Sequence, residues 1–260
     1  MRFGFGKNWQ SYSRTALTQE RITQARQAFD QLFQGIDLKG RSFLDVGFGQ
    51  GLSLVCAAQA GADALGIDID SDNLAAVALT AKAMGHAQVP KTRIASILDP
   101  DCVQDLRAKG GFDVVHSWGV LHHTGDMARA FDHACSLVAD GGHLVCAIYN
   151  RHWSSPVWKA VKYLYNRSPA LVQRFFIALL YPVIYLAKWL VTGKDPRRKD
   201  RGMDFYHDVV DWVGGYPYEY ASIQEIRDLV CPKGFECLHV NPARVPTGCN
   251  EFVFRRSGTP

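Results

Sequence analysis

Residues 43–51 read Phe43-Leu44-Asp45-Val46-Gly47-Phe48-Gly49-Gln50-Gly51, an apolar run that leads into three alternating glycines. A second apolar run, Gly66-Ile67-Asp68-Ile69-Asp70, follows and also ends in acidic residues. A strand, a glycine-rich turn, a helix and a strand with a terminal acid about 20 residues on form the order of a nucleoside-binding βαβ unit. The first stretch therefore decides the fold and locates the expected site.

The sequence around this unit alternates short β-rich runs with amphipathic segments. We expect strands near residues 42–46, 64–68, 92–96, 112–117 and 143–149, with helices between them. This alternation is typical of a mostly parallel sheet covered by helices on both faces. Two later runs, near 235–240 and 251–254, indicate an antiparallel pair at the sheet edge, and Ser222-Ile223-Gln224-Glu225 is a capping box ahead of the last helix.

We expect four segments along the chain. Residues 1–40 form an N-terminal arm and helix, 41–150 a cofactor-binding core, 151–215 a helical cap insertion, and 216–260 the last helix and the antiparallel strands. The chain has 260 residues, of which 47% are hydrophobic and 21% charged, and this suits one α/β domain with an insertion. Seven cysteines without a C-x-x-C pair, and no run like a signal-peptide core after Met1, indicate a reduced cytoplasmic protein.

The charge of the chain is unevenly distributed. Residues 150–201 hold eleven Lys or Arg and two Asp, a net of +9, which leaves −5 for the rest of a chain whose total is +4. Such a segment suits an anionic partner or is a solvated helical face. Within it, the apolar run 175–187 is short for a membrane span of ~20 residues. We expect a buried pair of cap helices kinked at Pro182, with an interfacial membrane segment as the alternative.

Five motifs, in order, resemble those of the class I S-adenosylmethionine-dependent methyltransferases. They are residues 44–51 (motif I), 66–70 (the acidic loop), 95–99 (the adenine loop), 112–123 (motif IV) and 141–145 (the turn into strand five). The resemblance implies a Rossmann-like, seven-stranded, mostly parallel sheet with the last strand antiparallel. The expected α/β fold also has an N-terminal helical arm and a helical cap insertion after strand five. The resemblance also implies S-adenosylmethionine as the cofactor and S-adenosylhomocysteine as its product.

The acid beside the glycines bears on the kind of ligand. Asp45 would repel a pyrophosphate, whereas it suits a ligand with an ammonium or sulfonium charge. The resemblance implies that Asp45, Gly47 and Gly49 surround the methionine part of the cofactor and that Asp68 holds the ribose. It places Ser96 and Ile97 at the adenine, and it places Ser117 and Trp118 beside the methyl group. The family often has Asp at the position of Ser96. The expected cofactor set is Trp9, Asp45, Gly47, Gly49, Asp68, Ile69, Ser96, Ile97, Ser117 and Trp118.

Trp9 belongs to this set through a second resemblance. The N-terminal arm and the late stretch Trp212-Val213-Gly214-Gly215-Tyr216-Pro217 are similar to those of a bacterial methyltransferase subgroup. This likeness implies an arm that folds over the cofactor. The alternative is that Trp9 packs on the insertion.

Transfer of a methyl group from a sulfonium needs an aligned acceptor and a dry site, and it needs a base only for a hydroxyl or a protonated amine. The candidate catalytic residues are His123 and the pair His207 and Asp211, which are four apart and share a helical face. Each also has a structural interpretation, namely a hydrogen bond to a neighbouring loop or within its helix. The candidate substrate residues are His122, Tyr149, Tyr216 and Tyr218.

The sequence argues against two other kinds of site. Cys231, Cys237, His239 and Cys249 lack a zinc-binding spacing, so we expect no metal and assign these cysteines to buried strands. Arg197-Arg198-Lys199 lies in no RNA-binding module, and no Asn-Pro-Pro-Tyr type motif follows the fourth strand, so we expect no nucleic-acid partner.

The sequence thus predicts a methyltransferase that acts on a hydroxyl or thiol of a small apolar or aromatic acceptor. Two alternatives stay open. One is a methyltransferase for a macromolecule or a lipid at a membrane surface, with peripheral contact through residues 151–201. The other is a cofactor-binding homologue without catalysis. The oligomeric state does not follow from the sequence.

Overall fold

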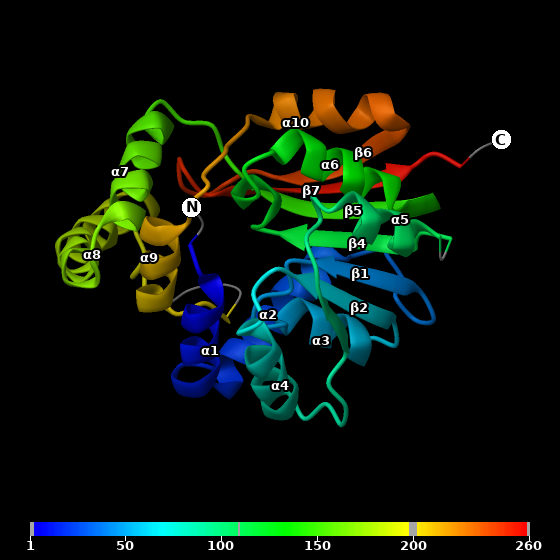
Figure 1. The fold of residues 1–260 in the computed structure, drawn as a ribbon, viewed down its shortest axis with the longest axis horizontal. Coiled ribbons are helices and arrows are strands. Elements are labelled where there is room, and N and C mark those ends of the chain that lie inside the picture. The colour runs from blue at the N-terminus through cyan, green and yellow to red at the C-terminus, as the bar shows by residue number, and fades with distance from the viewer. Residues whose placement is uncertain (1–2, 109, 198–201, 259–260) are drawn as a thin grey trace.

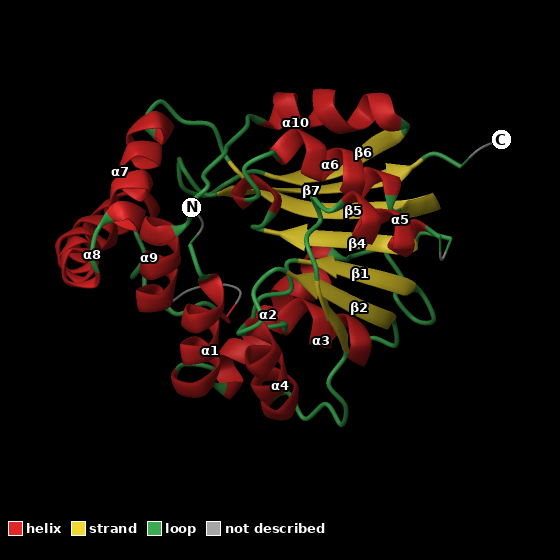
Figure 2. Cartoon of the chain, in the orientation of Figure 1, coloured by secondary structure: helices red, strands yellow, loops and turns green. Residues whose placement is uncertain are grey.

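The computed structural model describes residues 3–108, 110–197 and 202–258 of the protein, and its centre is a seven-stranded sheet (Figures 1 and 2). The strands are β1 (Ser42–Val46), β2 (Asp63–Asp68), β3 (Lys91–Ile94), β4 (Phe112–Trp118), β5 (Val138–Tyr149), β6 (Phe235–Asn241) and β7 (Cys249–Arg256). Their spatial order is β3-β2-β1-β4-β5-β7-β6. Strands β1 to β5 run parallel to one another, while β7 runs antiparallel to both β5 and β6. This confirms the expected sheet and its antiparallel edge.

Helices cover both faces of the sheet and extend beyond one end of it. They are α1 (Phe5–Thr15), α2 (Gln19–Leu32), α3 (Leu52–Gln59), α4 (Asn73–Ala83), α5 (Pro100–Arg107), the short η1 (Leu121–His123), α6 (Met127–Ser136), α7 (Ser155–Arg167), α8 (Ala170–Thr192), α9 (Phe205–Gly214), α10 (Ile223–Val230) and the short η3 (Cys231–Lys233). The capping box of α10 forms as expected, because Ser222 Oγ accepts from Glu225 N and the Glu225 carboxylate accepts from Ser222 N.

The strands bury side chains on both faces because successive residues point to opposite sides. Phe43 and Val114 pack under α2, α3 and α4 on one face. Their neighbours Leu44 and Val115 pack under α5, α6 and α10 on the other. Two apolar cores result, and both are needed to hold a sheet whose parallel strands read as nearly continuous apolar runs.

Helices α7, α8 and α9 form a separate group next to the carboxyl ends of the parallel strands (Figure 1). Their own apolar cluster includes Tyr165, Ile177, Ile184, Phe205 and Val209. The expectation of a buried pair of cap helices is wrong for α8. It runs unbroken through Pro182, is longer than the apolar run 175–187, and buries only Ile177 and Ile184. The physical reason is that, in the described part of the chain, α7 and α9 pack on one side of α8 only.

The turn after β1 depends on close backbone contacts. Gly47 has φ +77°, and a Cβ atom there would lie 2.4 Å from Cγ1 of Val120. Gly51 has φ +81°, and its Cβ would lie 2.4 Å from Cγ2 of Val77. Only glycine satisfies both the left-handed conformation and the lack of space. The alternating glycines therefore set how closely the turn approaches the rest of the core.

A pair of alanine substitutions separates these two requirements. Gly141 also has a left-handed φ, of +73°, but no atom lies within 4 Å of the position of its Cβ. We expect Gly141→Ala to lower the free energy of unfolding by roughly 1–2 kcal/mol through backbone strain. Gly47→Ala should lower it by about 1–3 kcal/mol more, because Val120 must move. Urea unfolding measures both values, and equal losses would contradict the account of the close approach.

Candidate functional site

A cavity of about 1350 Å³ lies at the carboxyl ends of the parallel strands. Its wall comes from the glycine turn after β1, from the ends of β2, β4 and β5, and from helices α1, α8 and α9. Ligand pockets of proteins are commonly about 300–1,000 Å³. This cavity is therefore large enough for a nucleoside cofactor together with a second molecule.

Most of the residues predicted from the sequence line this cavity. From the expected cofactor set these are Trp9, Asp45, Gly47, Gly49, Asp68, Ile69, Ser96, Ile97 and Trp118. From the expected catalytic and substrate sets they are His123, Tyr149, Asp211 and Tyr216. The topology thus brings together, in one wall, residues from Trp9 to Tyr216 that are far apart in the chain, because the strand ends converge.

Four predicted residues lie outside this wall: Ser117, His122, His207 and Tyr218. Ser117 is fully buried, and its hydroxyl donates to the Val46 carbonyl at 3.0 Å, so it joins β4 to β1. His122 is fully buried, and its Nδ1 accepts from the Tyr149 N–H at 3.3 Å. Tyr218 is fully buried, with its ring centroid 5.3 Å from that of Tyr149. These side chains support the cavity from behind.

Asp68 ends β2 and holds the glycine turn. Its Oδ2 accepts from the Gly49 N–H at 3.0 Å, and its Oδ1 accepts from the Asp70 N–H at 2.9 Å. Burial raises the pKa of Asp68, and these two N–H donors act in the opposite direction by stabilising the carboxylate. The side chain of Asn73 also hydrogen-bonds to this carboxylate. A carboxylate has about four acceptor sites, so three partners leave acceptor capacity for a ligand in the cavity.

Asp45 lies in the cavity wall against an imidazole that sequence reasoning did not single out. The strand register places Asp45 on β1 opposite His116 on β4, and Asp45 Oδ1 lies 2.7 Å from Nδ1 of His116. Both residues are almost fully buried, and Nε2 of His116 has no hydrogen-bond partner among the described residues. The imidazole of His116 therefore lies behind Asp45 and holds the carboxylate in the cavity wall.

The N-terminal arm crosses this end of the cavity. The Gly6 N–H donates to Oδ2 of Asp70 at 2.8 Å, and a Cβ on Gly6 would lie 2.6 Å from the same carboxylate. The indole of Trp9 lies over Gly49, 3.4 Å from where a Cβ would be. Asp70 Oδ1 also accepts from the Asp72 N–H ahead of α4, so Asp70 both caps that turn and anchors the arm.

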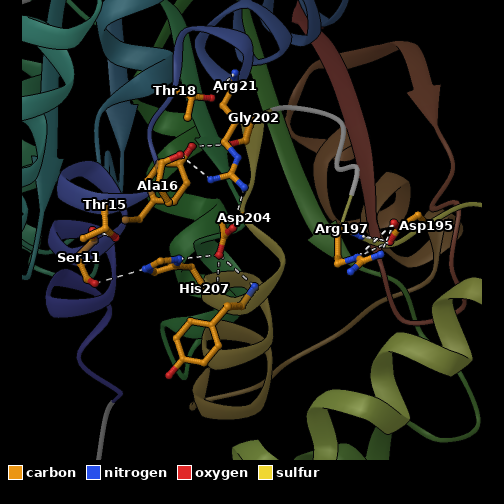
Figure 3. A network of polar contacts seen from close by, with 12 residues as sticks. Ser11, Thr15, Ala16, Thr18, Arg21, Asp195, Arg197, Gly202, Asp204 and His207 are labelled. Carbon is orange, nitrogen blue, oxygen red and sulfur yellow. Dashed lines mark hydrogen bonds and ion pairs between the residues drawn. The ribbon is translucent and has the colours of Figure 1, made fainter.

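The expected pairing of His207 with Asp211 does not occur. Nδ1 of His207 lies 2.8 Å from Oδ2 of Asp204, the residue that caps α9, and Asp204 also pairs with Arg21 at 2.7 Å (Figure 3). Nε2 of His207 lies 3.4 Å from Ser11 Oγ on α1. The cap position at i−3 is closer to the imidazole than the position at i+4 because Asp204 already faces the first turn of the helix. His207 therefore joins the arm to α9.

Asp211 has a different partner from the one predicted. Its Oδ1 accepts from Nδ2 of Asn8 at 2.8 Å, and Asn8 also donates to the carbonyl of His207 at 2.9 Å. Burial raises the pKa of Asp211 well above its usual range. The arm thus contacts both halves of the cavity, Asp70 on the core and Asp211 on the insertion.

His123 presents one nitrogen to the cavity. Its Nδ1 lies 2.6 Å from the Pro217 carbonyl, which only accepts hydrogen bonds, so we assign the hydrogen to Nδ1 and the lone pair to Nε2. Burial, together with the charge of Lys162, lowers the pKa of His123 to about 3. The ring is therefore a neutral hydrogen-bond acceptor at physiological pH.

Lys162 is a functional candidate that sequence reasoning missed. It is fully buried on α7, and its ammonium lies 4.1 Å from the ring centroid of Trp212 and 4.7 Å from that of Tyr218. It also donates to the Trp212 carbonyl. The available signal was helical spacing, because Trp158 and Tyr165 lie on the same face of α7 at i−4 and i+3. A lysine in that aromatic stripe is a candidate for burial.

The cysteines near the C-terminus lie in or beside the last strands, as expected, but they are only partly buried. This applies to Cys231, Cys237 and Cys249. They lie on the edge pair β6–β7 and on the short η3, where one side of the sheet is less covered. In residues 3–108, 110–197 and 202–258 no cluster of three or more His, Cys, Asp or Glu is arranged to hold a metal ion.

The sequence of the chain is similar to those of known methyltransferases. The profile of a methyltransferase domain family matches residues 17–205 of the chain. The ubiquinone biosynthesis O-methyltransferase of Psychrobacter arcticus is 34% identical over 126 residues, which are 48% of this chain and 47% of that protein. The enzyme of the same name from Nitrobacter winogradskyi is 28% identical over 118 residues, 45% of this chain and 42% of the relative. The matches span less than half of the curated relatives.

Solved structures share the fold at low identity. The magnesium protoporphyrin IX methyltransferase of Synechocystis with bound S-adenosylhomocysteine superposes with a TM-score of 0.56 and 16% identity, over 90% of this chain and 84% of that one. The [4+2]-cyclase SpnF superposes with a TM-score of 0.54 and 13% identity, over 90% and 81% of the two chains. Likeness at this level shows the Rossmann-like architecture and does not identify a reaction.

The family match covers well over half of the chain and includes the glycine turn, the acidic ends of β1 and β2 and the part of the cavity wall between residues 17 and 205. It confirms the resemblance inferred from the motifs. The chain belongs to the methyltransferase domain family, with the fold of the class I S-adenosylmethionine-dependent enzymes.

Proposed function

We propose that this protein transfers a methyl group from S-adenosylmethionine to a hydroxyl oxygen of a small, apolar or aromatic acceptor. The single observation that carries the proposal is one continuous cavity with two chemically different ends. One end has the glycine turn and three buried or half-buried acids, and the other has aromatic rings, His123 and Asp211. The curated relatives with O-methyltransferase names support oxygen as the receiving atom.

The acidic end fits the cofactor. Asp68 keeps acceptor capacity for the ribose after accepting from the turn and from Asn73, and Gly49 and Trp9 line the same end of the cavity. Asp45, held in place by His116, would face the charged methionine part. When bound, S-adenosylmethionine supplies a methyl group on a positively charged sulfur, and acids near this charge favour binding.

The aromatic end suits an apolar acceptor. Tyr149, Trp158, Trp212 and Tyr216 line it, and these large rings give apolar contact with few rotatable bonds. We propose that the arm (residues 1–40) and the insertion (151–215) close a core formed by 41–150 and 216–260, and that they exclude water from the reacting atoms.

His123 would receive the acceptor hydroxyl. Its Nε2 lone pair accepts the hydroxyl hydrogen, and this directs an oxygen lone pair toward the methyl group. When the hydroxyl oxygen takes the methyl group that S-adenosylmethionine would supply, its proton would pass along this hydrogen bond to Nε2 of His123. Because the pKa of His123 is lowered to about 3, the imidazole is a weak base that orients the acceptor more than it deprotonates it. This favours phenolic hydroxyls, which ionise more easily than aliphatic ones.

The cofactor assignment is tested at the two ends of β2. We expect Asp68→Ala to weaken binding of S-adenosylhomocysteine about 10- to 100-fold, the effect of leaving hydrogen-bonding groups unpaired. Asp63→Ala is the matched control, because Asp63 begins the same strand and is exposed. Isothermal titration calorimetry gives both affinities. Unchanged binding to Asp68→Ala would mean that the ribose lies elsewhere.

The acceptor assignment is tested with labelled cofactor and acceptors of one carbon skeleton that carry a hydroxyl, a thiol or an amine. We expect methylation of the phenol, and a loss of about 10²-fold in kcat for His123→Gln. His239→Gln, an exposed histidine on β6, serves as the control. Transfer to the thiol alone would reject oxygen as the receiving atom, and a chain that neither binds the cofactor nor turns over would reject the proposal.

Lys162 makes stability depend on pH in a predictable direction. Burial lowers the pKa of Lys162 from its usual 10.5 to about 7. Between pH 7 and 10.5 the unfolded chain therefore binds a proton that the folded chain lacks, so this group's destabilising effect is complete below pH 7 and declines as the pH rises.

We expect the melting temperature of Lys162→Met, relative to wild type, to be highest below pH 7 and to fall as the pH approaches 10. Each 1 kcal/mol corresponds to about 2–4 °C in a domain of this size. Lys159→Met, an exposed position on the same helix, should show no such trend. A difference that stays constant with pH would contradict the burial of a titrating ammonium at residue 162.

A further inference from the structure

The outer face of α8 is an exposed apolar stripe. Six large residues on it are each more than half exposed: Leu171, Phe175, Leu179, Val183, Leu186 and Leu190. Their spacings of four and three residues place them on one side of the helix. Figure 1 shows α8 as the outermost helix at its end of the molecule. Contiguous apolar surface of this kind marks a binding face, because water-exposed helices normally present polar residues there.

The charges around the stripe are of one sign. From Arg151 to Lys194 the chain contains seven Lys or Arg and no Asp or Glu. Five of the cations are exposed: Arg151, which pairs with Glu225, and Lys159, Arg167, Arg174 and Lys194. An apolar stripe flanked by cations is complementary to an anionic lipid surface. Two copies of the chain stacked through α8 would instead bring these like charges together.

The other face of α8 shows how deeply the helix can enter a bilayer. By length and composition α8 is able to cross a membrane. However, its inner side packs on α9, where the ring centroids of Tyr181 and Tyr185 lie 4.9 and 5.8 Å from that of Phe205. In addition, Nζ of Lys188 lies 2.9 Å from Oδ2 of Asp208. A spanning position would draw this ion pair and α9 into hydrocarbon, which is unfavourable. The helix can therefore lie in the plane of the interface with only its outer stripe immersed.

The same helix forms part of the cavity wall. Ile184, Ala187, Lys188, Val191 and Thr192 line the cavity. Val191 both lines it and is 56% exposed, so the cavity opens beside the C-terminal end of α8. A molecule dissolved in the immersed layer would reach this opening without passing through bulk water.

We propose that α8 lies in the surface of an anionic lipid bilayer and that the adjacent cavity opening admits a lipid-soluble acceptor directly from it. The part about the acceptor rests on the proposed function. The part about docking rests only on the stripe, the flanking cations and the packing of the inner face.

Sedimentation with vesicles of phosphatidylglycerol and phosphatidylcholine tests the docking. We expect the wild-type chain to bind these vesicles at low salt and to bind pure phosphatidylcholine vesicles more weakly. The double variant Leu179→Glu/Leu186→Glu should bind about tenfold or more weakly, because two apolar contacts are replaced by charges that an anionic surface repels. Leu238→Glu is the matched control, since Leu238 is 48% exposed on β6, far from α8.

Three results would overturn the docking. The wild-type chain could stay in the supernatant, or the double variant could bind as the wild type does. Alternatively, sedimentation velocity without lipid could show a wild-type dimer that the double variant loses, which would make the stripe a self-association face. An unchanged rise in melting temperature with S-adenosylhomocysteine shows that the double variant is folded.

A second assay separates docking from chemistry. A phenol with a long alkyl chain is placed in the vesicles, and a short water-soluble phenol is offered alone. We expect the double variant to lose activity toward the first and to keep it toward the second. Vesicle binding without turnover of either phenol would overturn the proposed function and leave docking intact. Equal activity of variant and wild type toward the embedded phenol would overturn acceptor uptake from the bilayer.

Discussion

The approach of the glycine turn to the end of β2 is the constraint on which the site depends. Gly47 N–H donates to the Ile67 carbonyl at 2.7 Å, and Gly49 N–H donates to the Asp68 carboxylate at 3.0 Å. These bonds join the ends of two adjacent strands and fix the floor of the cavity. They form only because the turn adopts left-handed φ values where Val120 leaves no space for a Cβ atom. A binding surface for a nucleoside thus follows from a packing requirement of the backbone.

The arm and the insertion are built onto this floor through a few polar contacts. Asp70 anchors Gly6, Asn8 reaches Asp211, and Asp204 connects α9 to Arg21 and His207. The contacts of Gly6, Asn8 and Arg21 join segments that are far apart in the chain, so closure of the cavity depends on the arm being in place. The buried side chain of Lys162 lies behind the aromatic end, and burial of His123 together with this charge lowers the pKa of its imidazole. Polar contacts therefore connect the arm to both the core and the insertion.

The sequence predicts the sheet, its antiparallel edge and the acidic end of the cavity because local patterns encode them. Strand periodicity, a capping box and glycines beside an acid are properties of neighbouring residues. The pairing of Asp45 with His116 depends on strand register. The pairing of His207 with Asp204, in place of Asp211, depends on Asp204 being the cap residue of α9. Register and cap choice are decided by tertiary packing, so they do not follow from spacing alone.

The insertion was the least predictable part for a related reason. Its apolar residues indicate a helix, but the same composition serves a buried cap or an exposed face. Only the positions of α7 and α9 show that the stripe containing Leu179 and Leu186 is left uncovered in the described structure. Similarly, the charge of Lys162 favours the surface on average, and its burial follows from the aromatic residues that α9 and the strand ends place around it.

The central claim is that the cavity above β1 and β2 holds S-adenosylmethionine. A crystal structure of the protein with S-adenosylhomocysteine tests it most directly. The account predicts ribose hydroxyls on Asp68, the methionine part beside Gly47 and Asp45, and the sulfur directed toward His123. A nucleoside bound elsewhere, or a cavity that stays empty at saturating ligand, would contradict it.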